Sequence, residues 1–99
     1  MEEINMQKFD LQRTVVTCGV GEIIERNSDN HEKLMTLLYC FSQGDFGTLC
    51  KEDVRQNNDS IKHNYGMVMG IFELDGTTIW IITYLGEGGY TTVLLPSEY

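Results

Sequence analysis

This chain has few basic residues, and its C-terminal third has none. Lysine and arginine number 7 against 15 aspartate and glutamate residues, so the formal charge is −8, and residues 65–99 contain no lysine or arginine. An acidic surface repels nucleic-acid phosphates and anionic membranes and attracts basic surfaces. The composition therefore favours a protein partner with a basic surface, with no direct contact to nucleic acid or membrane. A charge that serves solubility alone is the alternative interpretation.

Cysteine is scarce, and its spacing does not match the common zinc motifs. Cys18, Cys40 and Cys50 form an odd number without a CxxC pair, and His31 and His63 are also far from them in sequence. Zinc ligands usually come in pairs two to four residues apart, so we predict no metal site and no cofactor. We interpret the three cysteines as buried small hydrophobic residues.

The sequence also lacks a long apolar run and a secretory leader. No apolar stretch approaches the ~18 residues that a transmembrane helix needs, and residues 1–10 have no apolar core of the kind found in signal peptides. Together with the odd cysteine count, this predicts a soluble protein of a reducing cytosol. We expect residues 1–99 to form a single domain, with residues 1–11 as a flexible arm.

Catalytic motifs are missing as well. Cys50 stands where a helix is expected to start, but no histidine is spaced to act as its base. Glu22, Glu25 and Asp45 form no acid–base pair in sequence, and the turn at residues 86–89 lacks the lysine and the helix of a phosphate-binding loop. We therefore predict no catalytic residues and no enzyme activity. A small metal- or thiol-dependent enzyme is the least favoured alternative.

Local patterns predict a strand and a short helix near the N-terminus. Residues 12–18 (QRTVVTC) are rich in β-branched side chains and stop at Gly19, which is typical of a short strand. Residues 22–26 are expected to form one or two helical turns. The polar cluster at residues 27–30 then ends them, because its side chains compete for backbone hydrogen bonds.

Two longer helices are predicted before residue 65. Apolar residues recur at helical spacing at Leu34, Leu37, Leu38 and Phe41. This spacing predicts a helix over residues 30–42, with Ser28 or Asp29 as its N-cap. After a glycine-rich break, Thr48 is the expected N-cap of a second helix over residues 49–62. The second helix has little apolar content and should lie on the surface.

The clearest local signal is a hairpin near residue 75. Asp75-Gly76 stands between two apolar runs, and both central residues of a type I′ turn need positive φ. A two-residue loop pairs Leu74 with Thr77 and therefore places Trp80 opposite Ile71. The register of the two strands is set by this turn.

A third strand is predicted from Tyr90 to Leu95, after the glycine-rich turn and before Pro96, which cannot donate to a ladder. We expect Tyr84 to pair with Tyr90. The predicted fold class is α+β, with an antiparallel meander of three C-terminal strands plus a short N-terminal strand, packed with two main helices.

Both faces of this meander are apolar, and we name them after Ile79 and Trp80. The Ile79 face consists of Val68, Phe72, Ile79, Thr83, Thr91, Val93 and Leu95. The Trp80 face consists of Met67, Met69, Ile71, Trp80, Ile82, Tyr84, Tyr90, Thr92 and Leu94. The first long helix suits the Ile79 face. The Trp80 face is either covered by the second helix and the N-terminal strand or open to a partner, since its aromatic and methionine content is favoured at binding hot spots.

The C-terminal third resembles a family of small proteins found on bacterial plasmids, integrative elements and prophages, usually labelled plasmid-related or type I restriction subunit. The residues that carry the resemblance are Trp80-Ile81-Ile82-Thr83 and the ending at residues 91–99 (TTVLLPSEY). It extends through residues 17–20, residues 44–47 and the spacing of Cys50, Glu52, Asp53 and Asn57. The resemblance implies an accessory protein of a mobile element, of unestablished biochemistry, in the cytoplasm of a bacterial host.

The chain departs from that family at its polar positions. The family pattern has arginine, histidine and tryptophan where this sequence has Cys18, Phe41 and Phe46, and Glu-Ala-Asp-Arg where it has residues 84–87. A loss of polar groups with a gain of aromatic ones favours an interface over a catalytic centre.

Taken together, these features predict a non-enzymatic inhibitor of a host defence nuclease, with an anti-CRISPR protein as the most specific form. The predicted partner-binding residues are Trp80, Tyr84, Tyr90, Met67, Met69, Glu73, Asp75 and Glu87. The alternative is an accessory or antitoxin-like module that forms a homodimer through the same face.

Overall fold

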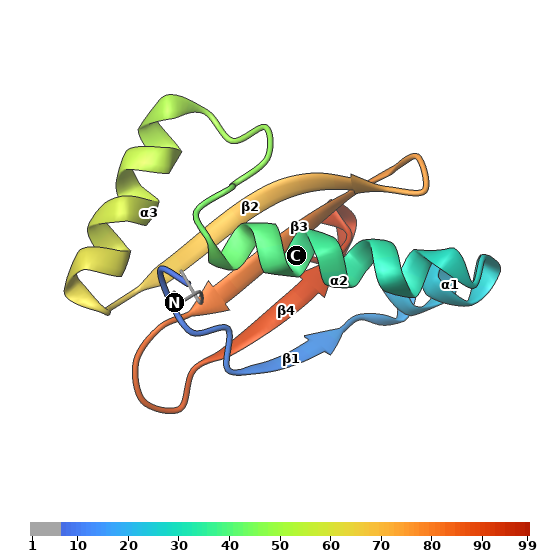
Figure 1. The fold of residues 1–99 in the computed structure, drawn as a ribbon, viewed down its shortest axis with the longest axis horizontal. Helices are drawn as coiled ribbons and strands as arrows, with labels where there is room; N and C mark the ends of the chain where they lie inside the picture. The colour runs from blue at the N-terminus through green and yellow to red at the C-terminus, as the bar shows by residue number, and fades with distance from the viewer. Residues whose placement is uncertain (1–6) are drawn as a thin grey trace, which may run out of the picture.

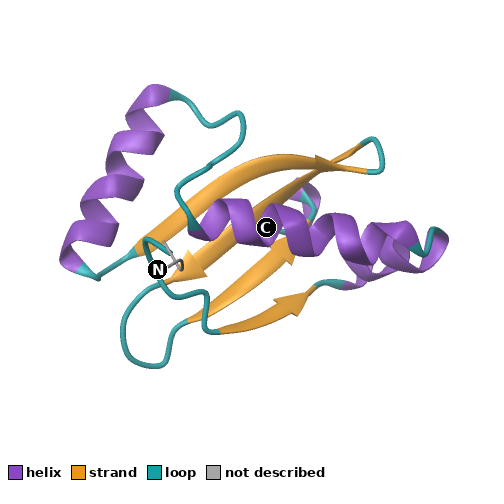
Figure 2. Ribbon diagram, viewed as in Figure 1, coloured by secondary structure: helices purple, strands orange, loops and turns teal. Residues whose placement is uncertain are grey.

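The computed structural model describes residues 7–99 as a four-stranded mixed sheet with helix α2 lying across one face (Figure 1, Figure 2). The elements are β1 (Arg13–Val16), α1 (Cys18–Arg26), α2 (Asp29–Ser42), α3 (Lys51–His63), β2 (Met67–Leu74), β3 (Thr77–Tyr84), β4 (Tyr90–Leu94) and the 3-10 turn η1 (Pro96–Glu98). The strands lie in the order β1-β4-β3-β2. The predicted α+β class is confirmed.

Strand β1 makes the sheet mixed instead of a pure antiparallel meander. It pairs in parallel with β4, with Arg13 opposite Tyr90 and Val16 opposite Val93. The ladder continues by one residue, because the Thr17 N–H donates to the Val93 carbonyl at 3.0 Å. A parallel pair needs a long crossover connection, and the chain between β1 and β4 supplies one with three helices and the β2–β3 hairpin.

The hairpin has the predicted turn and register. Asp75 and Gly76 have φ of 53° and 78°, as a type I′ turn requires. Trp80 lies opposite Ile71 in the β2–β3 ladder, and Tyr84 lies opposite Tyr90 in the β3–β4 ladder. These pairs are confirmed. Strand β4 ends one residue earlier than predicted, because Leu95 turns out of the ladder as the N-cap of η1.

The core lies between α2 and the Ile79 face, and Phe41 is at its centre. The Phe41 side chain is fully buried, with the rings of Phe9, Phe46 and Phe72 edge-on to it at centroid distances of 5.2, 6.0 and 6.2 Å. These are all four phenylalanines of the sequence. Gly70 lies beneath the ring, where a Cβ would come within 2.9 Å of Phe41. The absence of a side chain at this position lets the helix approach the strand closely.

Part of the predicted N-terminal arm is held against α2. The Lys8 N–H donates to the Ser42 carbonyl at 2.8 Å, and Phe9 is buried against Phe41. Residues 1–6 of that arm lie outside the described residues.

Helix starts differ from the predicted ones, and this changes the role of the cysteines. Helix α1 begins at Cys18 and not near residue 22, and Cys50 takes the place of Thr48 as the N-cap of α3. Cys18 and Cys50 are exposed there, and Cys40 is half-buried. The interpretation of the cysteines as buried residues is wrong for Cys18 and Cys50, because both lie on the solvent-facing side where the chain enters α1 and α3. Ser28 is the N-cap of α2 but forms no side-chain cap.

Strand β2 forms one edge of the sheet, and the chain itself covers that edge. Asn57 of α3 binds both backbone groups of Met69, with Nδ2 donating to the carbonyl at 2.7 Å and Oδ1 accepting from the N–H at 3.1 Å. Further along the edge, Thr48 N–H donates to the Ile71 carbonyl at 3.0 Å and Ile71 N–H donates to Phe46 at 3.1 Å. These bonds prevent another chain from pairing with β2.

We expect the substitution Asn57→Ala to lower the free energy of unfolding by about 2 kcal/mol, because it leaves two backbone groups of Met69 without partners in a site where Asn57 is only 4% exposed. Urea denaturation measures the change. The matched control is Asn58→Ala at the exposed neighbouring position, which should leave the midpoint almost unchanged. Equal effects of the two substitutions would contradict the role given to Asn57.

Candidate functional site

The Trp80 face lies on the side of the sheet away from α2, outside the hydrophobic core. The core cluster and the residues packed against it include members of the Ile79 face and of all three helices, and none of the Trp80 face. Ile82 and Leu94 of the Trp80 face are nevertheless buried, at 2% and 5% exposure. The Trp80 face therefore contains buried positions although none of its members belongs to the core cluster.

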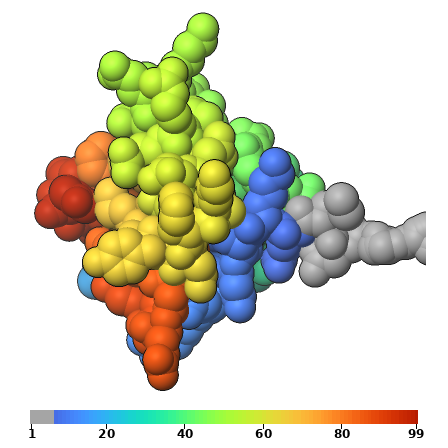
Figure 3. All heavy atoms as spheres, turned by 90° about the vertical axis from the view of Figure 1, so that its left-hand side faces the viewer, coloured from blue at the N-terminus to red at the C-terminus, as the bar shows by residue number. Residues whose placement is uncertain are grey.

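Of the two alternatives for the Trp80 face, cover by the second helix and the N-terminal strand is not what the described residues form. Helix α3 lies beside β2, where its Val54 and Ile61 pack against the core cluster, and β1 extends the sheet in its plane instead of crossing it (Figure 1). In Figure 3, the C-terminal residues lie on one side of the molecule and α2 with the described N-terminal residues lies on the other. The short turn η1 contacts β3 on the Trp80 side.

One end of the Trp80 face presents an exposed cluster of two tyrosines and a methionine. The rings of Tyr84 and Tyr90 contact each other in a tilted arrangement, with centroids 5.3 Å apart and planes at 42°, and the two residues are 37% and 41% exposed. Met67 lies opposite Tyr84 in the ladder and is 36% exposed, and Met69 is half-buried on the same face. Paired aromatic rings next to flexible methionine side chains are typical of protein-binding surfaces.

The other end of the face is partly closed by the C-terminal turn. Tyr99 lies edge-on to Trp80, with centroids 5.5 Å apart, and Trp80 is half-buried. The turn is held by Glu98, whose carboxylate accepts hydrogen bonds from the Thr17 hydroxyl, from Gly19 N–H at 3.0 Å and from Leu95 N–H at 2.9 Å. Glu98 therefore fastens the C-terminus to the start of α1.

Of the predicted acidic residues, Glu73 and Asp75 lie near the hairpin turn, whereas Glu87 lies at the opposite end of the sheet. Glu73 is exposed on the Trp80 side near the hairpin turn, and Glu87 is exposed in the loop at the opposite end of β3. Asp75 is engaged within the chain, since it accepts from Asn30 Nδ2 at 3.1 Å and from Arg26 Nε at 3.3 Å. The hydrogen bond from Asn30, together with the bond and the charge of Arg26, lowers the pKa of Asp75 below its ordinary value. The predicted acids therefore form no single cluster with the aromatic residues.

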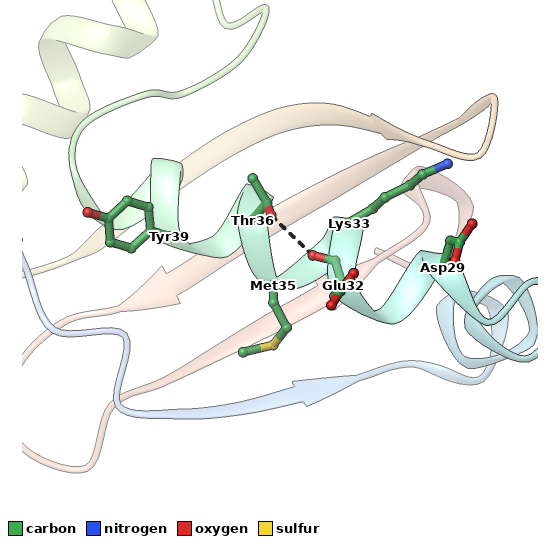
Figure 4. A pocket seen from close by; sticks show the side chains of 6 residues that line it. All are labelled: Asp29, Glu32, Lys33, Met35, Thr36 and Tyr39. Atoms are coloured by element: carbon green, nitrogen blue, oxygen red, sulfur yellow. Dashed lines mark hydrogen bonds between the residues drawn. The ribbon is translucent and has the colours of Figure 1, made fainter.

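Further hollows lie on the α2 side, and no sequence pattern predicted them. One, of about 720 Å³, lies along the outer face of α2, and Figure 4 shows its lining by Asp29, Glu32, Lys33, Met35, Thr36 and Tyr39. The Thr36 hydroxyl there donates to the Glu32 carbonyl at 3.2 Å. Another is a groove between α2 and β1. Its only sequence signal is that Met35 and Tyr39 fall off the Leu34–Leu38 stripe of α2.

The part of the chain that the structure describes has neither a metal-ligating cluster nor a membrane-spanning helix. Residues 7–99 contain no group of three or more His, Cys, Asp or Glu side chains that could hold a metal ion. None of the helices in this part is long and apolar enough to cross a membrane. His31 and His63 are exposed on separate helices, and the cysteines are free.

Comparison of the chain with protein-family models, curated proteins and solved structures finds no match.

The Glu98 contacts predict a pH-dependent stability. Hydrogen bonds from the Thr17 hydroxyl, Leu95 N–H and Gly19 N–H lower the pKa of Glu98 below its ordinary value of 4.5. A lowered folded-state pKa means that the ionised carboxylate stabilises the fold above pH 4.5, and that this contribution is lost as the pH falls through the lower value. We expect Glu98→Gln to be less stable than the wild type at pH 7, with the difference vanishing in acid.

Urea denaturation of both proteins across a pH series measures this difference. The substitution Glu25→Gln, at an exposed glutamate of α1, is the matched control and should show no such convergence. A difference between Glu98→Gln and the wild type that stays constant down to strongly acidic pH would show that the carboxylate charge has no part in holding the turn.

Proposed function

We propose that this protein is a non-enzymatic inhibitor that binds a host defence nuclease through the Trp80 face. The most specific form of this proposal is an anti-CRISPR protein. The observation that carries the proposal is the Tyr84–Tyr90 ring pair, which lies partly exposed beside Met67 on a sheet face that none of the helices α1 to α3 covers in the described chain. Tyrosine rings lose little conformational entropy on binding and are enriched at interface hot spots, and flexible methionine side chains adapt to the shape of a partner.

The charge of the chain supports a basic partner. With a formal charge of −8, the protein is attracted to surfaces that hold nucleic-acid phosphates, and such surfaces are a common property of nucleases. Glu73 and Glu87 stand at opposite ends of the sheet and would flank a partner seated on the Trp80 face. The apolar centre would provide affinity, and the surrounding charge would accelerate association.

The resemblance to plasmid and prophage proteins supports the class of partner. Proteins encoded by mobile elements benefit from inactivating host nucleases that cut incoming DNA. An inhibitor of this kind needs no catalytic residues, because it acts by occupying its target in stoichiometric amounts.

The direct test is DNA cleavage by purified bacterial defence nucleases, RNA-guided and restriction enzymes among them, with increasing amounts of this protein. We expect cleavage by one of them to fall in proportion to the added protein and to stop when inhibitor and nuclease are about equimolar. Full cleavage by every nuclease at a large molar excess would contradict the proposal.

The double substitution Tyr84→Ser with Tyr90→Ser tests the assigned face. Both side chains are partly exposed, so we expect the fold to persist and the affinity for the target to fall by about tenfold or more. The matched control is Tyr39→Ser, at a tyrosine that is 58% exposed on α2 on the opposite side of the sheet. Circular dichroism checks folding, and equal inhibition by the double variant and the wild type would remove the Trp80 face from the proposal.

Trp80 gives a direct optical measure of binding, because it is the only tryptophan of the chain and is half-buried on the proposed face. We expect the target to reduce acrylamide quenching of Trp80 fluorescence, with an association rate that falls as salt rises from about 50 mM to about 0.5 M. With a tryptophan-free variant of the target, the signal comes from this protein alone. Binding that left the quenching unchanged would place the target elsewhere.

A further inference from the structure

Strand β1 forms the second edge of the sheet, and in contrast to β2 no segment within residues 7–99 pairs with this edge. In a parallel ladder only alternate residues bond to the neighbouring strand. Because Thr17 N–H donates to Val93, the backbone groups of Arg13 and Val15 face β4, whereas those of Thr14 and Val16 point away from the sheet. No hydrogen bond within residues 7–99 reaches these outward groups.

Exposed apolar side chains border the β1 edge. A groove of about 490 Å³ runs between β1 and α2, and Val16, Met35 and Tyr39 line it at 42%, 54% and 58% exposure. Folded proteins normally protect a sheet edge with charges, proline or a covering segment, as this chain does at β2. At β1 the exposed charge of Arg13 is the only such charge on the strand, and no described segment covers its outward backbone groups. An edge without a covering segment beside an apolar groove indicates a surface on which another strand can pair.

We propose that β1 pairs with β1 of a second copy of this chain, antiparallel across a two-fold axis at Val15, to form one eight-stranded sheet. In this register Thr14 lies opposite Val16 of the partner subunit, and Val16 lies opposite Thr14 of the partner subunit. Residues that face each other with outward backbone groups exchange two hydrogen bonds, so the two pairs form four. With the two-fold axis at Thr14 or at Val16, only that residue of β1 would face an outward-pointing residue of the partner's β1. Fewer of the outward backbone N–H and C=O groups of β1 would then be hydrogen-bonded.

The charges on the Trp80 side complement each other in the same register. Arg13 lies opposite Thr17 of the partner subunit, and in each copy the Thr17 hydroxyl donates to Glu98. The Arg13 side chain lies on the Trp80 side, because Arg13 pairs with Tyr90 of that face. Thr17 is four positions further along the extended chain, so its side chain lies on the same side. Arg13 has no ion-pair partner among the described residues. The two-fold axis brings it close to the Glu98 carboxylate of the partner subunit, and the symmetry repeats this contact once on the other side of the axis.

This arrangement places both Trp80 faces on one side of the extended sheet, because the axis is perpendicular to it. The dimer would then present two copies of the binding face to a target. Dimer formation itself depends on β1 and not on the proposed function, so each can fail without the other.

Light scattering and sedimentation of the full chain test the proposal over a wide concentration range. We expect the mass to rise to twice the 11.3 kDa of one chain. Amide hydrogen exchange at Thr14 and Val16 should slow as the dimer forms. A monomer at every concentration up to about 1 mM, or rapid exchange at both amides in the dimer, would overturn the proposal.

Two substitutions locate the contact. Thr14→Pro removes an outward N–H that no described residue uses, a change that an edge strand tolerates, and should abolish the dimer. Arg13→Glu places a carboxylate beside Glu98 of the partner subunit and should weaken the dimer by about tenfold at low salt, less at high salt. Its matched control is Arg55→Glu, the same charge change at an exposed position on α3, which should leave the dimer intact.

If Thr14→Pro fails to fold by circular dichroism, the comparison of Arg13→Glu with Arg55→Glu decides the question. Equal weakening by both would show a general charge effect and overturn the assigned register. A dimer that survives the substitutions in β1 but is lost on changing Tyr84 and Tyr90 would place the contact on the Trp80 face and overturn the proposal.

Discussion

The two-residue turn at Asp75–Gly76 is the constraint on which the rest of the sheet depends. A type I′ turn permits a single pairing of the strands it joins, and a shift by one residue would exchange the two faces. Asp75 also accepts hydrogen bonds from Asn30 and Arg26, and the Asn30 amide donates as well to the Ile23 carbonyl at 2.8 Å. The turn therefore sets the register of the sheet and at the same time attaches the sheet to α1 and α2.

Two apolar faces follow from this register, and the helices cover only one of them. Helix α2 packs on the Ile79 face, where Phe41 gathers the other phenylalanines around it. Helix α3 could have formed a second layer, but it lies along β2 and uses Asn57 to satisfy the backbone of Met69. The Trp80 face is left with the C-terminal turn as its main contact. This position of α3 closes the β2 edge, whereas no described segment closes the β1 edge. The surface proposed for a target and the edge proposed for a second copy therefore have the same structural origin.

Several parts of this arrangement could be predicted because their signals are local. The positive φ needed at Asp75 and Gly76 gives the hairpin, and counting from the turn gives the pairs Trp80–Ile71 and Tyr84–Tyr90. The parallel pairing of β1 with β4 could not be predicted, since it joins segments separated by most of the chain and β-branched residues are equally suited to either orientation. The exposure of Cys18 and Cys50 was missed because helix starts are the least certain feature of a local pattern.

The sequence by itself determined the turn, the strand register, the apolar character of both faces and the excess of acidic charge, because each depends on neighbouring residues or on composition. Only the tertiary structure decided which face is covered and which edge is closed. Those outcomes depend on whether α3 packs over the sheet or beside it, and the decisive contacts, such as Asn57 with Met69, join elements through side-chain hydrogen bonds that leave no periodic pattern in the sequence. The exposure of Tyr84 and Tyr90 is therefore a property of the fold, although their position on one face is a property of the sequence.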